Sequence, residues 1–157
     1  MEPKAEQCSQ RYLDFGINRQ DWPVVVIGFA AMMAIAIPVG YLLGAIKPHL
    51  PTALAGGTGA WEALLKLVKE PLETSFFEEL FFRALIFGWM AKRLPLEAAA
   101  ILSTLIFGLT HIPAGLAMVV FATVLGYILA KAYARTKRIM VPVIIHYLVI
   151  LAGSFLL

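Results

Sequence analysis

One apolar run near the start of the chain constrains its fold more than any other feature. It extends from residue 22 to residue 46 and contains no charged side chain. A helix needs about 20 apolar residues to cross the hydrocarbon core of a bilayer, so this run is long enough to span one. We therefore predict a membrane-spanning helix here, with Pro38 as a site where the helix can kink.

The composition extends this prediction to the rest of the chain. Hydrophobic residues make up 61% of the 157 residues, and charged residues make up only 15%. A soluble domain is about half apolar and about a quarter charged, so a water-surrounded core of this size could not bury the excess. The length favours a single domain. We expect an all-α fold, a polytopic transmembrane helix bundle.

The remaining segments divide at loops and prolines. A loop is predicted at residues 47–60, which are rich in Pro and Gly. Residues 61–73 have helical spacing of apolar positions and predict a short interfacial helix that breaks near Pro71. Further spanning helices are expected at about residues 74–91, 95–111, 116–133 and 139–157. The bundle would then contain about five spanning helices.

Basic residues between the predicted spans set the expected orientation. Lys92-Arg93 and the cluster at residues 131–138 should face the cytoplasm. Residues 1–21 would form a cytoplasmic N-terminal tail, and residues 22–157 the membrane-embedded domain. We expect a multi-pass cell membrane protein, and the short loops favour a bacterial inner membrane. The net charge of +3 does not gather on one face, which argues against nucleic acid as a partner.

Three charged residues interrupt the predicted second span, namely Glu78, Glu79 and Arg83. A charge at mid-membrane costs about 3 kcal/mol or more on insertion scales, so such residues are seldom accidental. Glu79 and Arg83 are four residues apart and can pair on one helix face. Glu78 is rotated by about 100° from Glu79 and has no partner on its own helix. Its carboxylate is therefore suited to general acid–base chemistry.

Two histidines lie in later spans and complete a candidate site. His111 ends the third span, and His146 lies within the fifth. Three helices of a small bundle could bring these histidines close to Glu78, which is a hypothesis about tertiary structure. The alternative is a purely structural set, in which the glutamate–arginine pair stabilises its helix and each histidine binds a backbone carbonyl. The cost of burying five polar side chains favours the functional interpretation.

The order of these motifs resembles that of a known family. Glu-Glu-x-x-x-Arg, then Phe-x-x-x-His and then a later His are similar to the motifs of the CAAX protease and bacteriocin-processing family (CPBP, or Abi), which includes the type II CAAX prenyl endopeptidases. The resemblance covers about residues 70–157, and each motif lies on its own predicted span. It implies a membrane-embedded, glutamate-dependent endopeptidase.

The resemblance also implies a role for each residue. Glu78 would activate the hydrolytic water with help from His111, and Glu79 and Arg83 would hold the geometry of the site. His146 would help to stabilise the oxyanion of the tetrahedral intermediate.

The family chemistry requires no cofactor, although its members are often classed as metalloproteases. If zinc binds, Glu78, His111 and His146 would be its ligands, because three protein ligands and a water form the usual catalytic site. The expected partners are the lipid bilayer and a peptide or lipidated-protein substrate.

One position departs from the family pattern. The last motif usually reads His-x-x-x-Asn, but here the fourth residue after His146 is Ile150, and no Asn or Gln follows Gln20. Losing one oxyanion donor typically lowers the rate by about 10²–10³-fold. An alternative is therefore a catalytically weak or silent member that acts in peptide binding or bacteriocin immunity. A small transporter or proton relay is a third hypothesis, which the lack of a paired repeat disfavours.

Overall fold

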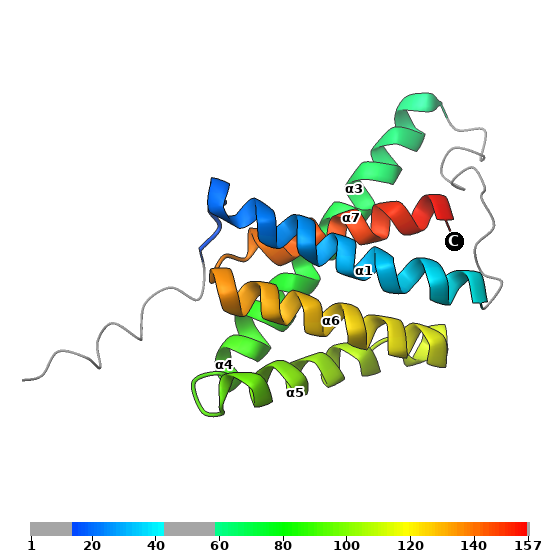
Figure 1. Cartoon of the computed structure of the whole chain (residues 1–157). Helices are drawn as coiled ribbons and strands as arrows, with labels where there is room; N and C mark the ends of the chain where they lie inside the picture. The colour runs from blue at the N-terminus through cyan, green and yellow to red at the C-terminus, as the bar shows by residue number, and fades with distance from the viewer. Residues whose placement is uncertain (1–13, 43–58, 157) are drawn as a thin grey trace, which may run out of the picture.

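The computed structural model describes residues 14–42 and 59–156, and every regular element within these ranges is a helix. The elements are η2 (Arg19–Asp21), α1 (Trp22–Leu42), α3 (Ala60–Glu79), η3 (Leu80–Phe87), α4 (Gly88–Met90), α5 (Leu96–Leu109), η4 (Ile112–Ala114), α6 (Leu116–Thr136) and α7 (Met140–Leu156). The fold is an all-α bundle, as predicted (Figure 1). Most of the predicted loop at residues 47–60 and of the N-terminal tail lies outside the described residues.

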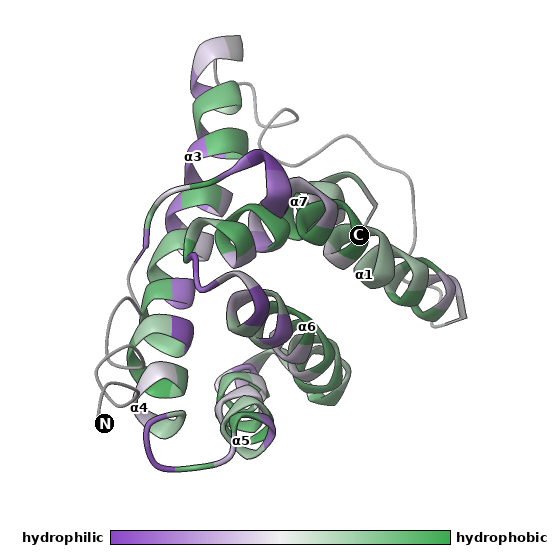
Figure 2. Cartoon of the chain, turned by 60° about the vertical axis from the view of Figure 1, so that its left-hand side comes forward, coloured by the Kyte–Doolittle hydropathy of each residue, from purple (hydrophilic) through white to green (hydrophobic). Residues whose placement is uncertain are grey.

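The outer surface of the bundle is largely apolar. Within the described residues, two helices are long and apolar enough to cross a membrane, Arg19–Tyr41 and Leu116–Thr136, and two shorter apolar helices are Leu96–Leu109 and Met140–Phe155. Large hydrophobic side chains such as Ile27 and Leu116 point outward. Figure 2 shows hydrophobic residues along most of the length of the helices. An exposed apolar surface of this extent is typical of a lipid-facing bundle.

The predicted break at Pro71 is wrong. α3, η3 and α4 follow one another from Ala60 to Met90, and Pro71 lies inside α3. Proline removes one backbone donor from a helix. Here Pro71 is buried, however, and α3 packs against α7. The helix therefore continues, and it crosses the other helices obliquely (Figure 1).

The segment η3 is a π-helix that begins directly after Glu79. The N–H of Gly88 donates to the carbonyl of Arg83, five residues earlier. Short π-helical segments within α-helices occur frequently at functional sites. The wider turn thus starts where the charged residues lie.

α5 and α6 approach each other closely through small residues. A Cβ atom on Gly126 would lie 2.8 Å from Cδ1 of Phe107, and one on Gly108 would overlap the hydroxyl of Thr123. Small residues allow this close approach of helix backbones in membrane proteins. Phe107 is fully buried here, next to Phe82 of η3 and Ala122 of α6.

One end of the bundle carries a network of charged residues. Arg138, between α6 and α7, lies 2.5 Å from Asp21 and 3.4 Å from Asp14. The hydrogen bond with Asp21 raises the pKa of the Arg138 guanidinium. The start of α1, the α4–α5 connection and the end of α6 all lie at this end, and the α5–α6 turn lies at the other (Figure 1). This alternation matches the order of the predicted spans.

Candidate active site

Two neighbouring glutamates at the end of α3 have different environments. The side chain of Glu79 is fully buried, whereas 31% of the Glu78 side chain is exposed. Successive residues of a helix point about 100° apart, so one faces the bundle interior and the other faces an accessible space. The helix therefore provides one structural carboxylate and one that a substrate can reach.

The buried glutamate pairs with Arg83, as its spacing predicts. Arg83 Nε lies 3.0 Å from Glu79 Oε2, and neither side chain is exposed. Arg83 Nη2 also donates to the carbonyl oxygen of Gly126 at 3.4 Å, and the guanidinium carbon lies 4.8 Å from the centre of the Phe107 ring. Both partners of such a buried ion pair are needed for stability, because removing either one leaves a buried charge without its counter-charge.

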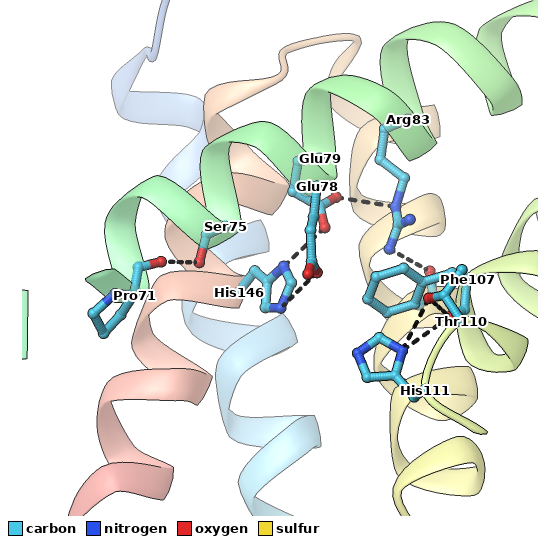
Figure 3. A network of polar contacts seen from close by, with 10 residues as sticks. Pro71, Ser75, Glu78, Glu79, Arg83, Phe107, Thr110, His111 and His146 are labelled. Carbon is cyan, nitrogen blue, oxygen red and sulfur yellow. Dashed lines mark hydrogen bonds and ion pairs between the residues drawn. The ribbon is translucent and has the colours of Figure 1, made fainter. Parts of the chain in front are cut away.

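His146 connects the two glutamates from α7. Its Nδ1 lies 3.0 Å from Glu79 Oε1, and its Nε2 lies 3.8 Å from Glu78 Oε2 (Figure 3). The short contact orients the imidazole, in the way a carboxylate orients a catalytic histidine. The longer one exceeds hydrogen-bond distance, so Glu78 is free to accept a proton from another donor.

The cluster contains two carboxylates, those of Glu78 and Glu79, and one guanidinium, that of Arg83, with the His146 imidazole between the carboxylates. Nδ1 of His146 faces Glu79, and Nε2 faces Glu78.

His111 lies against the Phe107 ring. Its Nδ1 is 3.0 Å from the carbonyl oxygen of Phe107 and 3.2 Å from the hydroxyl of Thr110, which itself donates to that carbonyl at 2.7 Å. The centre of the Phe107 ring lies 4.9 Å from that of His111 and 6.0 Å from that of His146. Among the described residues, His111 makes no direct contact with Glu78 (Figure 3).

The structure thus brings four of the five predicted residues into one cluster and places His111 apart from it. Three further residues complete the site: Phe107, Thr110 and Gly126. Phe107 lies within the Phe-x-x-x-His motif, but the motif does not reveal that its ring contacts both histidines. Gly126 contributes only a carbonyl oxygen, and its sequence context carries no signal of this.

The predicted zinc ligands do not fit a metal site in this geometry. Within residues 14–42 and 59–156, no three histidine, cysteine, aspartate or glutamate side chains gather closely enough to hold a metal ion. His146 is already engaged with Glu79, and His111 is engaged with the carbonyl oxygen of Phe107. We therefore derive no catalytic step through a metal.

Ile150 lies one helical turn beyond His146 on α7 and is half-buried. Its carbonyl oxygen accepts a hydrogen bond from the hydroxyl of Ser154 at 3.0 Å. The side chain has no hydrogen-bonding group, so this position cannot provide the amide donor that the family motif contains.

Comparison with known proteins gives two matches. A family model described as "Type II CAAX prenyl endopeptidase Rce1-like" matches residues 58–151. The chain is also 35% identical over 82 residues to the "Putative membrane peptidase YdiL" of Bacillus subtilis (strain 168). That alignment covers 52% of this chain and only 33% of the relative, so the chain matches about a third of its length. No solved structure matches the chain significantly.

Proposed function

The chain belongs to the Rce1-like family of type II CAAX prenyl endopeptidases, and from this premise we propose that it is an intramembrane endopeptidase in which Glu78 activates water. The observation that supports this most directly is the difference between the two glutamates. Glu79 is fully buried between Arg83 and His146, whereas Glu78 is partly exposed beside the same histidine.

The hydrolysis can be written with these groups. A water molecule next to Glu78 transfers a proton to its carboxylate as the water oxygen bonds to the peptide carbonyl carbon. The carbonyl electron pair moves onto oxygen, and the Nε2–H of His146 donates to this oxyanion. When the C–N bond breaks, Glu78 returns the proton to the leaving nitrogen. The products are a carboxylic acid and an amine, and the enzyme returns to its starting state.

The other residues have positioning and assisting roles in this proposal. Glu79 and Arg83 hold the imidazole of His146 in place. Nδ1 of His111 faces the Phe107 carbonyl, so Nε2 is the ring nitrogen that remains for the site. We assign His111 to assist the hydrolytic water from the opposite side of the bound peptide.

The two ends of the bundle support a proposed placement in the membrane. Trp22 and Trp89 are about half exposed at the ends of their helices, and tryptophan is enriched at membrane–water interfaces. Trp22 begins α1 and Trp89 belongs to α4, and both of these segments lie at the bundle end that carries the basic loops (Figure 1). We propose a multi-pass membrane protein with this end in the cytoplasm and residues 22–157 in the bilayer, which acts on a lipidated peptide of the kind that the family description names.

A cleavage assay with reconstituted protein tests the mechanism. The substrate is a farnesylated peptide that ends in a CAAX sequence, presented in liposomes. Glu78→Gln keeps the size of the side chain but removes the base, so we expect the cleavage rate to fall by about 10²–10⁴-fold. Glu70→Gln changes an exposed glutamate of the same helix and should leave the rate unchanged. Cleavage by Glu78→Gln at the wild-type rate would exclude this mechanism.

A second candidate function rests on Ile150, which places a hydrocarbon side chain where the family has an amide. In this alternative, the protein binds a peptide in the same site without cleaving it. Ile150→Asn distinguishes the two, because restoring one oxyanion donor should raise the rate of a weak protease by about 10²-fold or more. If the wild type and Ile150→Asn both bind the peptide and neither cleaves it, the binding function is favoured.

A further inference from the structure

A groove lies on the outside of the bundle between α1 and α6. It encloses about 250 Å³. Its α1 wall includes Pro23, Ile27 and Ala31, and its α6 wall includes Ile128 and Arg135. None of its lining residues belongs to the candidate active site. The groove is therefore a separate feature of the surface.

The groove has one charged end and one apolar end. α1 and α6 lie side by side and run in opposite directions (Figure 1). The start of α1, with Pro23, therefore lies near the end of α6, with Lys131 and Arg135. Further along, the lining is formed by Ala31 and Ile128. The charged end coincides with the end of the bundle that carries the basic loops.

Lys131 at this end is compensated by a neighbouring carboxylate. Its Nζ lies 2.6 Å from Glu97 Oε2, and the hydroxyl of Tyr127 donates to the other oxygen of Glu97. Half of each side chain in the ion pair is exposed. The pair is locally neutral, and the ammonium keeps further N–H donors for another acceptor.

The positive charge of Arg135 is not balanced by a carboxylate in this way. Its side chain is exposed, and it has no carboxylate partner in the described part of the chain. The nearby acids Asp14 and Asp21 are both engaged with Arg138. The mouth of the groove thus has a net positive charge that comes from the guanidinium of Arg135.

We propose that this groove is a binding site for one anionic phospholipid. The phosphate lies against Arg135, and one acyl chain lies along the apolar surface between α1 and α6. A guanidinium binds phosphate oxygens through two parallel hydrogen bonds. Basic pockets between membrane helices on the cytoplasmic side bind anionic head groups. Because any acyl chain can fill an apolar groove that faces lipid, the head group decides the selectivity.

Native mass spectrometry of the full chain, purified in detergent, tests the proposal. Delipidated protein is titrated with phosphatidylglycerol or with phosphatidylcholine that has the same acyl chains. We expect one phosphatidylglycerol to bind at concentrations where phosphatidylcholine does not. Arg135→Gln should weaken this binding about fivefold, the effect of one basic residue near a head group. The variant changes an exposed side chain, so the fold should be retained.

Arg93→Gln is the matched control. Arg93 is an exposed arginine in the α4–α5 connection, at the same end of the bundle. Its guanidinium stacks on Trp89, and it does not line the groove. The affinity of this variant for phosphatidylglycerol should equal that of the wild type. Ala31→Phe fills the apolar part of the groove and should weaken binding with Arg135 intact. Equal binding of the two lipids, or an equal loss in Arg93→Gln and Arg135→Gln, would overturn the proposal. So would displacement of phosphatidylglycerol by a farnesylated peptide, which would identify the groove as a substrate site.

Discussion

At the scale of single residues, the site depends on Glu79, whose two carboxylate oxygens have different partners. One oxygen lies 3.0 Å from Arg83 Nε, and the other lies 3.0 Å from His146 Nδ1. The same carboxylate therefore neutralises a buried guanidinium and orients the imidazole next to Glu78. A single substitution at Glu79 should affect both stability and activity, whereas one at Glu78 should affect activity alone.

Thermal unfolding of Glu79→Gln and Glu78→Gln in the same detergent checks this division. Glu79→Gln leaves Arg83 buried without its counter-charge, and we expect a loss of about 3–5 kcal/mol in unfolding free energy. Glu78→Gln should unfold close to the wild type, because Glu78 is partly exposed and its ion-pair contact is 3.8 Å long. A similar loss in both variants would contradict the proposed roles.

At the scale of helices, the site is set by two kinds of contact. The long helix from Ala60 to Met90 crosses the bundle obliquely, so Glu79 meets α7 while Arg83 reaches α6 one turn later. α5 and α6 approach closely enough for Phe107 to lie over Gly126. The Phe107 ring contacts Arg83 and both histidines. The distance between α5 and α6 therefore determines where this ring lies in the site.

Gly126→Ala tests this contact. The added Cβ would lie 2.8 Å from the Phe107 ring, which is fully buried and packed against Phe82 and Arg83. Alanine favours a helix over glycine by about 1 kcal/mol, but overpacking costs about 1–3 kcal/mol. We therefore expect no gain in unfolding temperature and a lower cleavage rate.

Gly59→Ala is the control, because nothing lies within 4 Å of the Cβ that it would add. It should leave the cleavage rate unchanged. An unchanged rate in Gly126→Ala as well would show that the site does not depend on this helix contact.

At the scale of the whole molecule, the helices alternate between two ends that differ in charge. Arg138 ties the start of α1 to the α6–α7 connection through Asp14 and Asp21, so these segments lie at one end. The turn at η4 lies at the opposite end. The side of the membrane that each end faces is a prediction from the basic loops.

The single cysteine of the sequence makes this orientation testable. Cys8 lies in the predicted cytoplasmic tail. A membrane-impermeant maleimide should label it in inverted membrane vesicles and not in intact spheroplasts. Ala114→Cys, placed in the η4 turn of a Cys8→Ser protein, should show the reverse. The opposite pattern for either cysteine would invert the proposed topology.

Local features of this protein were predictable from its sequence. The apolar excess requires lipid around the helices, which predicts an all-α membrane bundle. The pair between Glu79 and Arg83 depends only on the spacing of two residues on one helix. The motifs also predict the family, which the match to residues 58–151 confirms. Pro71 was misleading, because a proline's effect on a helix also depends on tertiary packing, which is not a local property, and Pro71 is buried in a helix that packs against α7.

Only the tertiary structure decided how the later helices meet these residues. The sequence predicts both histidines near Glu78, with His111 assisting the water and His146 the oxyanion, but it does not predict which of them contacts the glutamates. In the structure, His146 contacts both glutamates, and His111 lies against the ring of Phe107. This difference depends on the oblique crossing of the long helix and on the close approach of α5 and α6. Both are set by packing between distant segments, so the sequence showed the charged residues and both histidines, but not that His146 is the one that contacts them.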